Sequence, residues 1–240
     1  SAFGADVVSV LGAGSGSFVD KNAGTGKAVN VTGFSLSGAD ASNYVVVQPT
    51  GLTANIAQAN LSITGVSANN RSYDGSTVAS LGGTASVTGL GGDVVSVTGT
   101  GTGSFVDKHV GTAKAITVTG FGLTGTDAGN YAIVQPTGLT ADITKANLNV
   151  TGVTAASRIY DATTVATLGG SATVTGYVGH TVNVTGTGAG TFANKNIGTA
   201  KPVTVSGYSL TGAEAGNYTI VQPTGVTADI TPASLTVTGL

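Results

Sequence analysis

The chain has 240 residues, of which 39 are glycine and none is cysteine, methionine or tryptophan, so a disulfide scaffold, thiolate-bound metal and thiol catalysis are excluded. Nine basic and eleven acidic residues give a net charge of -2, without the clustered positive charge that nucleic-acid binding needs. No apolar run approaches the roughly 18 residues of a membrane span, so we expect no membrane insertion. The abundant valine, threonine and glycine favour β-strands joined by tight turns.

The sequence is a tandem repeat. The dipeptides Asn43-Tyr44, Asn130-Tyr131 and Asn217-Tyr218 recur at an interval of 87 residues, and other landmarks keep the same interval. The chain therefore divides into a partial copy over residues 1–60, which holds the last 60 positions of the unit, complete copies over residues 61–147 and 148–234, and residues 235–240 as the first strand of a following copy. Because the array starts and stops inside a copy and lacks methionine, we expect a segment of something longer.

Within a copy, short segments rich in β-branched residues lie between glycine-rich breaks. In the copy from residue 61, Ile116 and Val118 alternate with threonines, as in a strand with one buried face. The eight predicted strands of this copy are residues 61–64, 77–81, 85–88, 94–98, 104–106, 115–119, 131–135 and 139–143. Only residues 126–130 could form a helical turn. The pattern predicts an all-β chain of tandem immunoglobulin-like antiparallel β-sandwiches. A parallel β-helix is the rival fold, but its coil period near 20 residues is missing here.

An acidic residue precedes the tyrosine of each Asn-Tyr pair by four positions. This spacing resembles the tyrosine corner of immunoglobulin-like sandwiches, in which the phenol bonds back to the backbone. The residues concerned are Asp40, Asn43 and Tyr44, then Asp127, Asn130 and Tyr131, then Glu214, Asn217 and Tyr218. The asparagines are interpreted as structural, since an amide beside a turn can satisfy buried backbone groups.

Junctions between copies are short. Residues 141–150 and 228–237 leave only two or three residues between strand-like segments, too few for free reorientation. We therefore expect successive domains to form a semi-rigid rod, each adding roughly 30 to 40 Å.

Near the start of each complete copy the chain reads Arg71-Ser-Tyr73-Asp74-Gly75 and Arg158-Ile-Tyr160-Asp161-Ala162. With the Gly-Asn-Tyr and Ala-Asp-Ile-Thr elements, the whole sequence resembles the YDG domain, which is similar to the MBG repeats. The resemblance implies a large secreted or surface protein of bacteria, including adhesins of the filamentous-haemagglutinin type, and no catalytic residue. Ala162 replaces the glycine of the triplet, which predicts that this turn does not require a positive φ in both copies.

Histidine and carboxylate positions give no sign of an enzyme or of a cofactor or metal site. His109 corresponds to asparagine in the other copies and His180 to aspartate, so we expect both to be surface residues without a nucleophile partner. The carboxylates lie singly, and Asp107 becomes Asn194, which disfavours an essential calcium ion in each copy. Asp74 and Asp161 are interpreted as turn formers or as ion-pair partners of Arg71 and Arg158.

Two lysines recur in every copy, and they leave two interpretations open. Lys–Asn isopeptide cross-links would require buried lysines, whereas exposed lysines would keep sheet edges soluble, which is the favoured interpretation. The lysines are Lys21, Lys108 and Lys195, with Lys27, Lys114 and Lys201.

Three functions remain in consideration. The first is a structural stalk or spacer of an extracellular adhesin or fibre at a bacterial cell surface, whose partners are its neighbouring repeats. The second is a repeated weak module for a glycan or host protein, which would gain avidity from repetition. The third is a filament subunit in which incomplete terminal copies are completed by strands of identical chains.

Overall fold

The computed structural model describes residues 2–239, which form an all-β structure with four single-turn 3-10 helices. The chain divides into two compact units. The first comprises Ser1–Ser67, Gly82–Thr102 and Val118–Thr137, and the second comprises Ala68–Leu81, Gly103–Thr117 and Gly138–Leu240. The middle sequence copy contributes to both units, and the copy boundaries after residues 60, 147 and 234 stay a prediction.

The first unit contains a three-stranded antiparallel sheet in the order β2-β3-β5 and the pairs β1–β4, β7–β10, β11–β14 and β6–β15. Its elements are β1 (Ser9–Leu11), β2 (Ser15–Phe18), β3 (Gly24–Thr32), β4 (Ser35–Ser37), η1 (Ala41–Asn43), β5 (Thr53–Ile56), β6 (Ala59–Ser62), β7 (Thr64–Ala68), β10 (Leu81–Ser86), η2 (Leu90–Gly92), β11 (Ser96–Thr98), β14 (Gly122–Thr124), η3 (Ala128–Asn130) and β15 (Tyr131–Val134).

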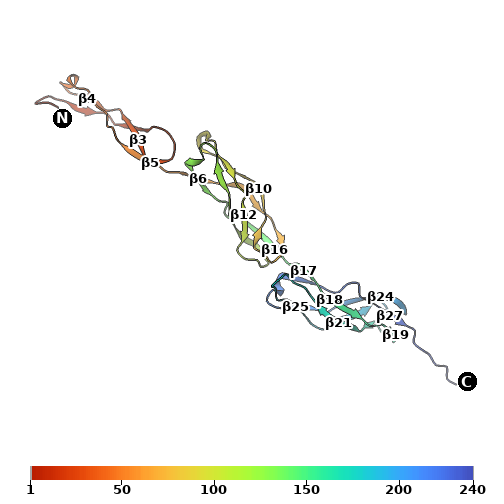
Figure 1. The fold of residues 1–240 in the computed structure, drawn as a ribbon. Coiled ribbons are helices and arrows are strands. Elements are labelled where there is room, and N and C mark those ends of the chain that lie inside the picture. The colour runs from red at the N-terminus through yellow and green to blue at the C-terminus, as the bar shows by residue number, and fades with distance from the viewer. Residues whose placement is uncertain (1, 240) are drawn as a thin grey trace. The chain divides into compact units, whose positions relative to one another are not determined.

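The second unit contains two five-stranded sheets, in the orders β8-β16-β13-β12-β9 and β19-β27-β24-β23-β20, and the pairs β17–β26, β18–β21 and β22–β25. Figure 1 shows β19, β27 and β24 side by side. Its elements are β8 (Arg71–Ser72), β9 (Val78–Ala79), β12 (Thr102–Phe105), β13 (Gly111–Thr119), β16 (Thr140–Thr144), β17 (Ala146–Asn149), β18 (Thr151–Ala155), β19 (Arg158–Ile159), β20 (Val165–Ala166), β21 (Leu168–Thr173), β22 (Asn183–Thr185), β23 (Ala189–Phe192), β24 (Gly198–Ser206), β25 (Ser209–Thr211), η4 (Ala215–Asn217), β26 (Tyr218–Val221) and β27 (Thr227–Thr231).

The core follows the predicted alternation. In β13, Ile116 and Val118 are buried while the threonines between and after them are exposed. The counterparts Val203 and Val205 in β24 belong to a buried cluster with Phe192. This cluster is completed by Ala166, Ala228 and Ile230. Burial of every second residue along these strands stabilises one face of each sheet.

The expectation of purely antiparallel sheets is wrong. β6 pairs in parallel with β15, and β17 pairs in parallel with β26. β8 and β19 also run parallel to β16 and β27. Parallel pairing is possible here because each of these strand pairs is separated by most of a copy, which provides the long crossover connection that a parallel pair needs.

Strand formation also differs from the prediction at the C-terminal end of the array. The single helical turns are present at η1, η3 and η4, as predicted for residues 126–130. Residues 232–239 form no strand, although a following copy's first strand was expected over residues 235–240; Leu240 lies outside the described residues. They leave the second unit as an extended tail (Figure 1). A strand needs a hydrogen-bonded neighbour, and no described residue pairs with this tail.

Candidate functional site: the junction between copies

Tyr73 of the second copy is held at the point where that copy passes into the third. It directly follows β8, and its backbone N donates to the carbonyl oxygen of Thr144 at 2.8 Å. Thr144 ends β16, and Lys145 alone separates it from β17. The parallel pairing of β8 with β16 therefore directs Tyr73 to the junction, where only 1% of the residue is exposed.

The ring of Tyr73 packs among three aromatic side chains of the third copy. The ring centroids of Tyr177, His180 and Tyr218 lie 6.0, 5.5 and 5.4 Å from that of Tyr73. The Tyr218 contact is edge-to-face, a favourable arrangement of aromatic quadrupoles. A residue of the Tyr-Asp-Gly triplet thus enters the next copy rather than only shaping its own turn.

Polar contacts surround the hydroxyl group of Tyr73. Its Oη lies 3.3 Å from Glu214 Oε2 and 3.3 Å from His180 Nδ1. Burial, with the nearby negative charge of Glu214, raises the pKa of Tyr73 to about 12. The phenol therefore remains a neutral hydrogen-bond donor at physiological pH.

A charged side chain of the second copy also reaches the third. Lys108 Nζ lies 3.2 Å from Glu214 Oε1 and 3.2 Å from His180 Nε2. The hydrogen bond from Lys108 is the main reason that the pKa of Glu214 is lowered. Glu214 therefore stays ionised while accepting bonds from residues of both copies.

Asn217 completes this set, which we call the junction cluster. Its Oδ1 accepts from the backbone N of Val110 at 3.1 Å, and its Nδ2 donates to Glu214 Oε2 at 2.7 Å. It is 5% exposed and is the buried polar residue of the described chain. The junction cluster comprises Tyr73, Lys108, Tyr177, His180, Glu214, Asn217 and Tyr218.

The first unit holds the corresponding junction between the first and second copies. Lys21 forms an ion pair with Asp93, and Asn130 Oδ1 accepts from the backbone N of Ala23 at 2.8 Å. Tyr131 Oη donates to Asp93 Oδ2 at 2.8 Å. The hydrogen bonds from Lys21 and Tyr131 lower the pKa of Asp93, and the Asp93 bond raises the pKa of Lys21.

The position 87 residues before Tyr73 falls outside the sequence. A cavity of about 390 Å³ lies in this junction. It is lined by Lys21, Leu90, Asp93, Asn130 and Tyr131, among others. Each of these five residues has a counterpart 87 positions later, and all five counterparts belong to the junction cluster.

The tyrosines of the Asn-Tyr pairs bond to the backbone, but 41 residues upstream rather than a few. Each phenol oxygen accepts from a backbone N, at 2.8 Å for Tyr44, 2.7 Å for Tyr131 and 3.1 Å for Tyr218. The donors are the backbone N atoms of Phe3, Leu90 and Tyr177. The bond ties the segment after each 3-10 turn, which is a strand at Tyr131 and Tyr218, to residues that precede the antiparallel pairs.

The acidic residues before these tyrosines have different partners in different copies. Asp40 and Asp127 accept from the backbone N of Val7 and Val94, at 2.9 and 2.8 Å. The side chain of Glu214 is longer than that of aspartate and lies in the junction cluster, where it accepts from Asn217 and Tyr73. Asn130 and Asn217 bond to the preceding copy, whereas Asn43 is exposed and lies away from any such contact.

Asp74 and Asp161 act as turn formers and as ion-pair partners together. Their Oδ1 atoms accept from the backbone N of Ser76 and Thr163, and each carboxylate also pairs with the arginine three residues before it. These bonds lower the pKa of both groups against the effect of burial. Asp74 and Asp161 thus stabilise the turn itself.

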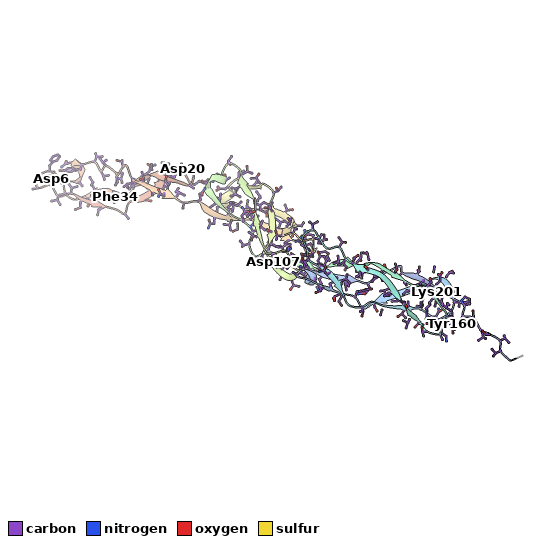
Figure 2. All side chains as sticks on the ribbon, turned by 60° about the horizontal axis from the view of Figure 1, so that its bottom comes forward. Asp6, Asp20, Phe34, Asp107, Tyr160 and Lys201 are labelled. Carbon is purple, nitrogen blue, oxygen red and sulfur yellow. The ribbon has the colours of Figure 1, made fainter. Side chains whose placement is uncertain are left out.

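The expectation about the triplet's third residue is wrong. Gly75 has a φ of 81° and Ala162 has a φ of 64°, so both turns adopt the left-handed region. Alanine tolerates this conformation at a cost of about 1–2 kcal/mol, which the aspartate bonds of the turn offset. The Tyr160 that precedes this turn is only half-buried and packs against the core of the third copy, near the C-terminal tail (Figure 2).

Sequence reasoning missed the roles of Lys21, Lys108 and His180. His180 is half-buried and belongs to the junction cluster, so the expectation of a surface residue without partners is wrong for it. Lys27 and Lys114 pair with Asp20 and Asp107, and Lys201 donates to Asn194 Oδ1 at 2.8 Å. The available signal was the joint change of Asp93 and Asp127 to His180 and Glu214 in the next copy, because it leaves one carboxylate near the lysine where the first junction has two.

Residues 2–239 contain no group of three or more histidine, cysteine, aspartate or glutamate side chains placed to hold a metal ion. None of their helices has the length and apolar character of a membrane span.

Comparison with known proteins identifies one family. Neither the curated proteins nor the solved structures include a match to the chain. The YDG domain model matches three times, over residues 1–51, 57–138 and 144–228. The second and third matches begin 87 residues apart, in agreement with the sequence interval and with the paired junctions described above. The chain therefore belongs to the YDG domain family, as a tandem repeat of that domain.

Proposed function

We propose that this chain is a structural spacer, a stalk segment of a secreted or surface-exposed bacterial adhesin or fibre. In this proposal each 87-residue copy is an immunoglobulin-like β-sandwich, and the copies follow one another as a semi-rigid rod. The wider assignment to adhesins of the filamentous-haemagglutinin type, and the similarity to MBG repeats, are part of the same proposal. The proposed location is extracellular.

The junction cluster is the observation that carries the proposal. A spacer must resist bending where its domains meet, because a flexible joint would shorten the average length of the array. Tyr73, Lys108 and Asn217 bond or pack across one junction, and the connection through Lys145 is a single residue long. Such a joint has little freedom of its own.

The sparse loops support the same role. Most connections within a copy are a few residues long, and the few charged side chains are largely used in ion pairs at turns and junctions. Short, tied loops offer few sites at which a protease can open the backbone, which suits a protein exposed outside the cell.

A glycan-binding role has weaker support. A sugar site is typically lined by exposed aromatic side chains, but Tyr73, Phe105, Tyr131 and Phe192 are buried. Tyr177 is 44% exposed and has no aromatic counterpart at Leu90, so a site built on it would not repeat along the array. Avidity through repetition would then be lost.

Small-angle X-ray scattering of fragments with increasing copy number tests the spacer proposal. We expect the maximum dimension to grow by a constant increment of roughly 30 to 40 Å for each added copy. An increment that shrinks with copy number would contradict a rod. Binding of a two-copy fragment to a glycan array, lost on removal of Tyr177, would favour the second function instead.

A further inference from the structure

The chain enters and leaves the third copy through strands that pair in parallel. It enters through β17, which pairs with β26, and leaves through β27, which pairs with β19. β17 directly follows Lys145, and the end of β27 lies at the opposite end of this copy (Figure 1). A pull along the chain therefore acts along these strands rather than across them.

The parallel direction decides how tension loads the hydrogen bonds at the entry. Tension draws β17 towards its N-terminus while the rest of the copy holds β26, so the two strands must slide past each other. Residues Ala146–Asn149 pair with Tyr218–Val221, and the backbone N of Val150 donates to the carbonyl oxygen of Val221 at 3.0 Å. Because the bonds of a parallel pair are evenly spaced, sliding loads them together. Two strands pulled apart from one shared end would separate bond by bond instead.

The last residue of the exit strand is held by two bonds to the start of the same copy. Thr231 ends β27, and its carbonyl oxygen accepts from the backbone N of Tyr160 at 2.8 Å. Its Oγ1 donates to the carbonyl oxygen of Arg158 at 3.3 Å. Arg158 lies in β19 and Tyr160 directly follows it, so these bonds fasten the chain at the point where it leaves the sheet.

The same exit contacts occur in the second copy. Thr144 ends β16, its carbonyl oxygen accepts from the backbone N of Tyr73 at 2.8 Å, and its Oγ1 donates to the carbonyl oxygen of Arg71 at 3.3 Å. Lys145 follows directly, so tension passing between the two copies reaches these bonds first. The entry pairing also recurs, as β6 beside β15. The arrangement is therefore a property of the repeat.

From this geometry we propose that the parallel pairs act as a tension clamp, which keeps a copy folded when the chain is pulled lengthwise. The tension clamp of the third copy consists of β17 on β26 and β19 on β27, with the two bonds of Thr231. The inference rests on the proposed spacer function, since only a chain held at both ends carries tension. It adds a second requirement to that function: a spacer under load must resist forced unfolding, which is governed by the unfolding rate rather than by equilibrium stability.

Pulling the 240-residue chain with optical tweezers in two directions tests the tension clamp. The chain has no cysteine, so two introduced cysteines determine where the handles attach. Lys145→Cys with Ala233→Cys pulls the third copy lengthwise. Ile197→Cys with Ala233→Cys peels β27 from β24 instead, because Ile197 precedes Gly198, which lies opposite Ile230 near the end of β27. We expect the lengthwise pull to need the greater unfolding force at the same loading rate. Equal forces, or a greater force for peeling, would overturn the proposal.

A substitution at the exit strand tests the named bonds. Thr231→Val removes the hydroxyl donor, and the loss of one hydrogen bond should raise the unfolding rate under a constant lengthwise force about two- to tenfold. Thr173→Val is the matched control, because its hydroxyl lies 3.2 Å from Thr151 Oγ1 in the antiparallel pair β18–β21, outside the tension clamp. It should leave this rate unchanged, and equal acceleration by both variants would contradict the clamp.

Failure of the tension clamp and failure of the spacer function are distinguishable. Scattering measures the length of the array without tension, so a copy that resists both pulling directions equally would leave the spacer function standing. A scattering increment that shrinks with copy number would reject the rod, whereas the pulling experiment reports on one copy alone.

Discussion

The two junctions of the array are built from corresponding residues but differ in what fills them. In the first unit, Lys21 pairs with Asp93, and a cavity of about 390 Å³ lies beside Tyr131. In the second unit, Tyr73 occupies the equivalent space and bonds to Glu214. The tyrosine of this Tyr-Asp-Gly triplet contacts the copy that follows it, since three aromatic side chains of that copy surround its buried ring.

The ion pairs also differ between the two junctions. The lysine is kept, but it lies near two carboxylates in the first junction, Asp93 and Asp127 (3.8 Å), and near Glu214 in the second, where histidine takes the position of Asp93. One lysine–carboxylate pair is therefore retained by two different arrangements.

Removing the tyrosine ring has the largest expected effect. Tyr73→Ala should destabilise the junction of the second unit by about 3–5 kcal/mol, as for other large buried aromatic residues, because it leaves a cavity like that of the first unit. Amide hydrogen exchange in residues 140–149 measures this locally, without assuming two-state unfolding of the whole chain. Tyr160→Ala is the control: its ring is half-buried, and an equally large effect there would contradict a special role for the junction.

Loss of the asparagine bond comes next. Asn217→Ala removes the acceptor for the backbone N of Val110, and a buried donor without a partner costs about 1–3 kcal/mol. Protection of the Val110 amide from hydrogen exchange should fall accordingly. Asn43→Ala, at the equivalent and exposed position of the first copy, should change stability by less than about 0.5 kcal/mol. Similar losses for both variants would disprove a junction role for this asparagine.

The third residue of the triplet is glycine in one copy and alanine in the next, so each can be replaced by the other. Gly75→Ala should cost about 1–2 kcal/mol, since alanine is strained at a φ of 81° and its Cβ would lie only 3.0 Å from His180 Cε1. Ala162→Gly should instead stabilise the third copy by up to about 1 kcal/mol, by relieving strain at a φ of 64°. Thermal unfolding of the two variants checks both signs, and a stabilising Gly75→Ala would refute the strain argument.

The smallest effect at neutral pH is expected from ionisation of Tyr73. Its pKa rises from an ordinary 10.0 to about 12 on folding, so the folded state holds this proton more tightly than the unfolded state. The resulting stability is complete below pH 10 and is lost as pH rises from 10 to about 12. Alkaline unfolding followed by circular dichroism should show a later decline for Tyr73→Phe, which cannot ionise. An unchanged decline would locate the titrating group elsewhere.

Some features could be predicted from the sequence because they depend on local or periodic information. The 87-residue interval follows from Asn43-Tyr44 and its counterparts, and alternation around Ile116 and Val118 predicts a half-buried strand. The turn at Asp74 is local as well, because its carboxylate bonds to an amide two residues away. The all-β class, the single helical turns and the family required no tertiary contacts.

Only the tertiary structure shows which residues of different copies contact each other. The bond between Tyr73 and Glu214 joins residues 141 positions apart, and the direction of β6 beside β15 depends on the crossover that connects them. Neither follows from a period, because a repeat fixes which residues are equivalent but not which of them are neighbours. Val45 and Leu235 carry the pattern of core strands but are 90% and 95% exposed, because no described residue pairs with their segments.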